Sequence, residues 1–397
     1  MSLMRHAHGG AARPAQQVRS SRSAWPRLFS LIVATFVVVA ALAAGWSLLW
    51  YYAADVANRT LTGWVQREAD AGRTYTCGKQ VIDGFPFRIR ARCVDASAVV
   101  STAQGPVTVH AGTISFTAPI YHPTLLTGDV EGPLTAAQSG QPSLRADWSL
   151  AQVTLRGLPF DPEAIGATVD AAHLDRGADA APVFAADHAD VEARIIAGSA
   201  RDHPTLEVTF HFNGATAPSV HPLLAQPLKG DIDAVVHGLK DFAPKTWPER
   251  FHEMQEAGGS IEIKSVRLDQ VQATIIGTGT LTINAHGKVD GLVSIAVAGI
   301  DNIIPLLGID KVIGQGIDRL AGLGGQSGQG LGTLDRLMPG LSDVVRDTTN
   351  ANLVENLKKM GQPTEIDKKP AIVLPLRVAD GSIYLGMVPL GDLPALF

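Results

Sequence analysis

The residues that most resemble a catalytic motif in this chain are HEMQE at 252–256. In zinc hydrolases, H-E-x-x-H places two histidines one helical turn apart as zinc ligands, and the glutamate activates water. Here Glu256 replaces the second histidine, so we interpret the stretch as a solvated helix face. No G-x-x-x-x-G-K-[ST] loop occurs, and GQSGQG at 325–330 lacks the spacing of a G-x-S-x-G nucleophile elbow. The sequence predicts no catalytic residue and no enzyme activity.

Histidines and carboxylates elsewhere in the chain do not form a spacing that is typical of a metal site. The twelve histidines are scattered, and His203 and His221 each precede a proline, so we expect histidines in turns and loops. Asp231, Asp233 and His237 share one face of an expected strand. Such a face is usually the wet side of a half-buried sheet. We therefore predict no metal and no cofactor.

The stretch GFPFRIRARC at 84–93 combines two residue types that could do chemistry. Alternation predicts one strand face with Phe85, Phe87, Ile89, Ala91 and Cys93 in the core, because successive side chains point to opposite faces. The other face presents three arginines, which suit planar anions such as lipid headgroups or an acidic partner. A solvated outer face is the alternative. These three arginines are Arg88, Arg90 and Arg92.

Cys77 and Cys93 are the two cysteines of the chain. An even count in an oxidising compartment predicts one disulfide, and closing a loop of this length contributes about 3 kcal/mol in the chain-entropy model. Simple hairpin pairing around a turn near Asp83 and Gly84 leaves the two cysteines out of register, so the bond requires a bulge or a cross-sheet link. Two buried free thiols are the alternative.

Charge and hydropathy divide the N-terminal region into a basic tail and an apolar segment. Residues 1–27 hold five arginines and no acid, and residues 28–54 carry no charge. We expect a disordered cytoplasmic tail at 1–27 and a transmembrane anchor at 28–54, because about 20 apolar residues span a bilayer and basic flanks stay in the cytoplasm. A signal peptide cleaved after the A-x-A site at 41–43 is the alternative.

This topology predicts a single-pass inner-membrane protein with its bulk in the periplasm. The remainder of the chain has 28 basic and 38 acidic residues, a balance of -10, and an acidic surface excludes nucleic acid as an expected partner.

Alternating hydropathy dominates the rest of the chain and predicts a mainly β fold: an extended, curved antiparallel sheet with late amphipathic helices. We expect a short membrane-exit helix at 55–72 ended by Gly72, and an antiparallel β domain at 73–300.

Gly112 stands where alternation changes parity, which predicts a bulge or bend. Further expected elements are a helix near 243–257 opened by Pro248, amphipathic helices with a Gly-rich linker at 301–360, and a C-terminal hairpin at 361–397. GFPF at 84–87 recurs as GLPF at 157–160.

The apolar anchor is followed by a Y-x-C segment ending at Cys77 and by the GFPFRI stretch closed by Cys93, and the chain has the ending LPLRVADGSIYLGMVPLGDLP. On these features the chain resembles domain of unknown function 2125, a proteobacterial envelope family. This resemblance covers residues from about 30 to the end and carries no known activity. The glycine-punctuated strands at 277–299 are also similar to AsmA-like proteins, which are inner-membrane-anchored and linked to envelope lipid homeostasis.

Three functions follow as hypotheses. A membrane-tethered apolar sheet face, covered by the helices at 301–322 and 341–360, would bind lipid or another lipophilic molecule in envelope maintenance. A filled core containing Phe85, Phe87, Trp148, Phe210 and Phe212 would instead indicate a scaffold that binds other envelope proteins. An enzyme is the third and least supported hypothesis. The expected partners are therefore the inner membrane, lipid and other envelope proteins.

Overall fold

A computed structural model describes residues 25–70, 72–102, 105–158, 161–177, 181–220, 222–243, 245–303, 355, 361–385 and 388–397. The chain divides into two compact units, Met1–Ala53 and Ala54–Phe397. The helices expected at 301–322 and 341–360, with the Gly-rich linker, fall outside the described residues except for the short helix α3 (Ile300–Ile303) and residue 355. The helices expected to cover the apolar sheet face therefore lie almost entirely outside the described residues.

The N-terminal helix α1 (Trp25–Asp70) runs through the boundary at residue 54 without a break. An anchor and a separate exit helix are expected on either side of this point, but no glycine or proline between 46 and 62 interrupts the helix. From Phe29 onward α1 is long and apolar enough to cross a membrane. It ends at Asp70, and Gly72, at φ 79°, donates its amide to the Ala69 carbonyl.

In the described part of the chain, eighteen strands form a single sheet, and all of their pairings are antiparallel. The expected mainly β, antiparallel fold is therefore confirmed. The strands are β1 (Arg73–Asp83), β2 (Arg88–Thr102), β3 (Gly105–Pro119), β4 (Leu125–Val130), β5 (Leu134–Gln138), β6 (Leu144–Asp147), β7 (Leu150–Arg156), β8 (Ala164–Arg176), β9 (Ala181–Ser199), β10 (Asp202–Ala215), β11 (Leu228–Val236), β12 (Ser260–Gln270), β13 (Ala273–Ile283), β14 (Val289–Ala298), β15 (Gln362–Ile366), β16 (Lys369–Ala379), β17 (Ser382–Leu385) and β18 (Val388–Asp392).

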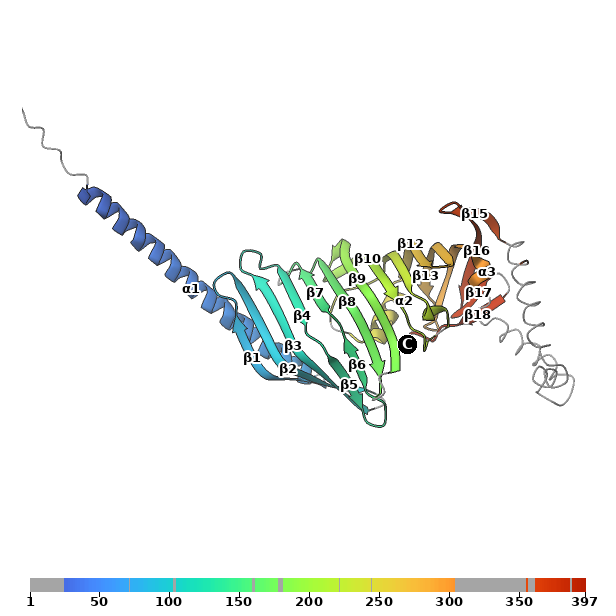
Figure 1. Cartoon of the computed structure of the whole chain (residues 1–397), viewed down its shortest axis with the longest axis horizontal. Helices are drawn as coiled ribbons and strands as arrows, with labels where there is room; N and C mark the ends of the chain where they lie inside the picture. Colours follow the sequence, from blue (N-terminus) through green and yellow to red (C-terminus); the bar gives the residue numbers. More distant parts are fainter. Residues whose placement is uncertain are drawn as a thin grey trace, which may run out of the picture. The chain divides into compact units, whose positions relative to one another are not determined.

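The order of strands in the sheet follows the order of the chain almost throughout (Figure 1). At each of three positions in the sheet, two short strands lie end to end. β4 and β5 both pair with β3, β6 and β7 both pair with β8, and β15 and β17 both pair with β16. Most strands are therefore paired with strands that are near them in sequence. The exception is β14, which ends at Ala298 and pairs with β16, which begins at Lys369.

Local sequence accounts for the tight turn near the C-terminus. Asp380 and Gly381 form a two-residue turn between β16 and β17, with φ of 51° and 79°. Both central residues of this hairpin turn require positive φ, which Asp tolerates and Gly adopts freely. This dipeptide therefore accounts for the turn between β16 and β17, within the range 361–397 where a C-terminal hairpin is expected.

Helix α2 (Trp247–Glu256) lies in the connection between β11 and β12 and begins with a capping box. Thr246 and Glu249 exchange side-chain to backbone hydrogen bonds, and Pro248 occupies the first turn. This confirms the helix expected near 243–257. The 3-10 helix η1 (Pro222–Ala225) precedes β11.

The fully buried apolar side chains concentrate in the last strands. One cluster consists of Val297, Ile300, Leu374 and Leu385, and a second consists of Ala298, Ile366 and Ala371. From β1 to the end of β10, the apolar side chains that are fully buried among the described residues are all small, namely Ala96, Ala186, Ala200 and Pro204. The early strands therefore present apolar faces that the described residues only half bury.

Candidate functional site

The stretch GFPFRIRARC lies partly outside the strand that the sequence predicts. Residues 85–87 form a turn, Gly84 has a φ of 104°, and the Arg88 amide bonds to the Gly84 carbonyl at 3.1 Å. The prediction that Phe85 and Phe87 face the core is wrong, because their side chains are 53% and 63% exposed. Alternation applies only to residues paired in a ladder, and β2 begins at Arg88. The hypothesis of a filled core that contains the rings of Phe85 and Phe87 is therefore wrong as well.

Cys77 and Cys93 form the predicted disulfide. Cys77 lies opposite Ala96, whereas Cys93 lies opposite Gln80. A three-residue offset along an extended strand would separate the two Cα atoms by about 10 Å, but they are 5.5 Å apart. Asp95, at φ 53°, departs from the extended backbone between the two positions. The bond thus forms inside one hairpin, across the irregularity at Asp95 and without a register shift between β1 and β2. The expectation that it requires a bulge or a cross-sheet link is wrong.

The three arginines occupy β2, and an acidic residue on β1 pairs with two of them. Asp83 lies 3.5 Å from Arg90 and also binds Arg92. Arg88 is exposed at the start of the strand. The pairing with Asp83 lowers the capacity of Arg90 and Arg92 to bind an anion or an acidic partner. The role in anion or partner contact that the sequence suggests for these residues stays a prediction.

A line of irregular residues crosses the first ten strands, and we call it the crease. The cross-strand register places these residues opposite one another, and Asp95, Ala171 and Gly214 among them have positive φ. On strands β4 to β7 the crease is the gap where the end-to-end strands meet. Its members are Gly78, Asp95, Gly112, Gly132, Trp148, Ala171, Asp187 and Gly214.

The crease reverses the alternation of every strand that crosses it while keeping apolar residues on one side. Cys93 lies opposite Gln80 and therefore points to the same side as Gln80. Regular alternation would place Cys77 and Gln80, three residues apart across the crease, on opposite faces. The disulfide shows instead that Cys77 and Cys93 share one face. On β9, Phe184 and Ala189 are an odd number of residues apart and line the same pocket. The parity break at Gly112, which the sequence predicts, is one point on this line.

The resulting apolar face continues from strand to strand, because residues paired across an antiparallel ladder point to the same side. Beyond the crease, Ala91 lies opposite Phe116, Val153 opposite Ala167, and Val191 opposite Phe210. The face continues through Ile232, Val266, Ile295 and Leu374 in the later strands. Its half-buried part on the earlier strands is the candidate binding surface of the protein, because at Leu374 the face is closed by the apolar cluster of the last strands.

An apolar pocket of about 230 Å³ opens on this face between β9, β10 and the segment that leads to β11. The rings of Phe210 and Phe212 have centroids 5.2 Å apart and form part of its wall. The polar groups that usually fix the orientation of a specific ligand contribute little, since Thr216 is its one polar lining residue. The lining residues are Phe184, Ala189, Phe210, Phe212, Ala215, Thr216, Ala217, Leu224 and Leu228.

The opposite face of the same strands is polar and carries histidine–carboxylate contacts. His188 Nδ1 lies 2.5 Å from Asp170 Oδ1, and its Nε2 lies 3.0 Å from Asp190 Oδ1. The hydrogen bond with Asp170, followed by that with Asp190, raises the pKa of His188. His211 contacts Asp231 at 2.9 Å. Within the described ranges no three His, Cys, Asp or Glu residues form a group that could hold a metal ion.

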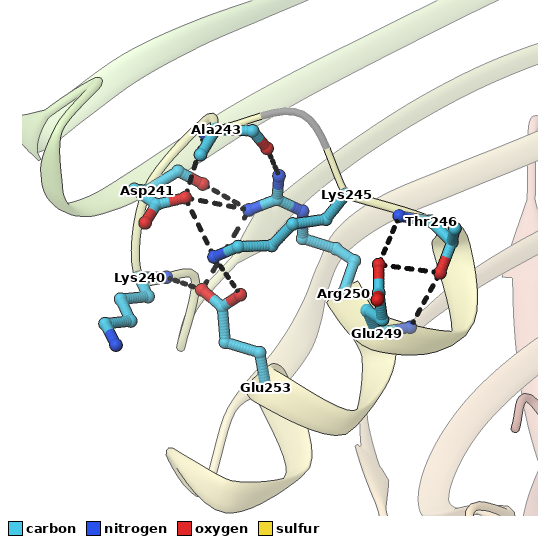
Figure 2. A network of polar contacts seen from close by, with 8 residues as sticks. All are labelled: Lys240, Asp241, Ala243, Lys245, Thr246, Glu249, Arg250 and Glu253. Carbon is cyan, nitrogen blue, oxygen red and sulfur yellow. Dashed lines mark hydrogen bonds and ion pairs between the residues drawn. The ribbon is translucent and has the colours of Figure 1, made fainter. Parts of the chain in front are cut away.

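Glu253, the glutamate of HEMQE, belongs to a polar network that fixes α2 to the preceding loop (Figure 2). It accepts from the Lys240 amide at 2.8 Å and from Lys245 Nζ at 2.6 Å, and Lys245 also binds Asp241 at 2.9 Å. The hydrogen bond from Lys245 and then that from the Ala243 amide lower the pKa of Asp241. Interpreting the whole stretch as a solvated helix face is wrong for Glu253, whose side chain is 13% exposed; His252 and Glu256 are exposed.

Sequence reasoning identifies the apolar faces that carry Phe210 and Phe212 but not the pocket. Phe184, Ala189 and Leu224 enter it from β9 and from the segment before β11. The signal that could have located Phe184 is the change of parity on β9 between Phe184 and Ala189, which matches the break at Gly112 on β3. The crease itself becomes visible only when the register aligns these breaks.

The family model described as "Uncharacterized protein conserved in bacteria (DUF2125)" matches residues 50–394 of the chain. No curated protein matches the chain.

Proposed function

The chain belongs to this DUF2125 family, and from that premise we propose that it is a membrane-anchored periplasmic protein that holds acyl chains or another lipophilic molecule on the apolar face of its sheet. The observation that carries the proposal is the continuous apolar face. The crease maintains this face along strands whose apolar side chains would otherwise move to the opposite side of the sheet. In this proposal the protein holds its ligand without converting it chemically.

Two features of the site favour an acyl chain over a polar metabolite. The pocket beside Phe210 and Phe212 is lined almost entirely by carbon, so a ligand would gain affinity mainly by burying apolar surface. The face also extends far beyond the pocket, which suits a long flexible chain better than a compact molecule. The apolar part of α1 supplies the membrane context, and the AsmA-like strand pattern supports the same proposal.

The alternative, an envelope scaffold, has less support. Its expected signs are a core filled by aromatic rings and free outer arginines. Phe85 and Phe87 are exposed, Phe210 and Phe212 line a pocket, and Asp83 pairs with Arg90 and Arg92.

Native mass spectrometry of the full-length protein extracted with lipid tests the proposal. Ala189→Trp places a large ring in the pocket, whereas Asn213→Trp adds the same ring on the exposed, polar side of the neighbouring strand. We expect the wild type and Asn213→Trp to retain lipid and Ala189→Trp to lose it. Lipid held around α1 is the same in all three proteins. Equal lipid in the two variants, or protein mass alone in the wild type, would overturn the proposal.

A further inference from the structure

Three exposed aromatic side chains lie together at one end of the strands, and we call them the aromatic rim. Phe85 and Phe87 occupy the turn between β1 and β2, and Tyr121, 67% exposed, lies in the turn between β3 and β4. The Ile120 amide donates to the Phe87 carbonyl at 3.0 Å, so the two turns are joined by their backbones. An exposed apolar patch of this kind usually marks an interaction surface.

Contacts within the second unit show at which end of the strands the first residues of that unit lie. Asn58 of α1 accepts a hydrogen bond from Gln80 at 2.8 Å, Trp64 stacks on Tyr75 with ring centroids 4.9 Å apart, and Glu68 binds Arg73. Later residues of α1 therefore contact earlier residues of β1. The N-terminal end of this stretch of α1 points toward the end of β1 that leads into the 84–87 turn. The aromatic rim lies at that same end.

The charge of the two turns suits an anionic surface. Residues 84–88 and 120–124 contain no acidic residue, and they include Arg88 and His122. Arg88 is exposed, and His122 lies edge-on to Tyr121 with ring centroids 5.2 Å apart. Aromatic rings beside basic side chains are typical of segments that sit in the headgroup layer of a bilayer, where rings bury carbon and cations meet phosphate.

We propose that the aromatic rim docks into the interfacial layer of the membrane that α1 spans. The strands then stand with their 84–87 and 120–124 turns against the lipid, and the apolar face of the sheet begins at the bilayer surface. This inference rests on the membrane anchor in the proposed function and is independent of whether the apolar face binds acyl chains.

The neighbouring turn limits the extent of the rim. Gly157, which follows β7, is joined to the turn between β3 and β4, because its amide donates to the Thr124 carbonyl at 3.0 Å. The connection from Gly157 to β8 carries Asp161 and Glu163, both exposed, and carboxylates are repelled by anionic headgroups. The docking surface therefore consists of the first two turns.

Environment-sensitive fluorescence of the full-length protein in vesicles of zwitterionic and anionic phospholipid tests the proposal. Single cysteines at Phe87 and, separately, at Tyr121 carry an NBD label; the native cysteines are held in their disulfide. The matched control is Val271→Cys, which labels an 80% exposed apolar residue in the turn between β12 and β13, at the opposite end of the strands. Val37→Cys, within the apolar part of α1, reports on the span itself.

We expect the Phe87 and Tyr121 probes to emit at shorter wavelength than the Val271 probe and to be quenched roughly twofold more by nitroxides at the headgroup level. The Val37 probe should be quenched by nitroxides deep in the acyl region. Two rim positions on separate turns guard against a single label that disturbs its own turn. If both rim probes behave like the Val271 probe while Val37 is quenched, the docking is wrong and the anchor stands. Rim probes that are shielded but not quenched by lipid nitroxides would also overturn the proposal, in favour of a protein partner.

Discussion

Strands β1 to β10 and strands β11 to β18 belong to one sheet but are stabilised differently. The later strands bury Leu374, Val297 and Leu385 in a compact apolar cluster. The earlier strands fully bury only alanines and Pro204 among their described apolar residues, and they carry the crease and the disulfide. The part of the sheet with the open apolar face therefore relies on covalent and backbone devices, whereas the other part relies on packing.

A matched pair of side-chain truncations should give the largest effect and tests this contrast directly. Leu374→Ala removes a side chain that is 2% exposed, and we expect the free energy of opening of β14 and β16 to fall by about 3 kcal/mol. Leu155→Ala truncates the same residue type on the half-buried face of β7 and should cost about 1 kcal/mol. Hydrogen exchange resolved by strand measures both. Equal losses would remove the distinction between the two parts.

Removal of the disulfide should have the next largest effect. Cys77→Ser with Cys93→Ser releases a loop of 16 residues in the sequence and should lower the stability of β1 and β2 by about 2–3 kcal/mol. Amide exchange in β14 and β16 serves as the internal control and should not change. A loss spread evenly over all strands would show that the bond supports the whole sheet and not its first hairpin.

Gly214→Ala examines the backbone of the crease. Gly214 has a φ of 65°, and an added Cβ would lie 2.1 Å from Asp187 Oδ2, so both conformation and space oppose a side chain. We expect a loss of about 1–2 kcal/mol in β9 and β10. Gly140→Ala is the control, because its φ is also positive at 78° but its Cβ would meet open space. A crease that is incidental to stability would give the same small loss for both variants.

The smallest expected effect is a pH dependence at His188. Its contacts with Asp170 and Asp190 raise its pKa in the folded protein, so protonation favours folding. The contribution is complete below the unfolded pKa of about 6.5 and is lost as pH rises through the higher folded pKa. Since the His188 side chain is 45% exposed, we expect less than about 1 kcal/mol. Exchange of β8 and β9 amides across this window measures it, and His188→Gln should flatten the profile.

Much of the architecture follows from local sequence, because the relevant physics is local. The capping box at Thr246, the Asp380–Gly381 turn and the parity break at Gly112 each depend on a few adjacent residues. The position of Phe85 and Phe87 could not be obtained in this way, because alternation continues through a turn whose geometry is set by Gly84 and the pairing of β1 with β2. The pocket required residues from β9, β10 and the segment before β11 to meet, which no short stretch encodes.

Because each strand from β1 to β13 pairs with strands that precede or follow it closely in the chain, this part of the sheet has the energetics of a linear array, whereas β14 pairs with the distant β16. Arrays of this kind are stabilised by nearest-neighbour terms, and unfolding can begin at one end without dissolving the rest. Local contacts also favour rapid folding, so β1 and β2 can pair as soon as both have been synthesised, long before β16 exists. The same organisation permits the array to gain or lose a hairpin during evolution while its neighbours keep their partners.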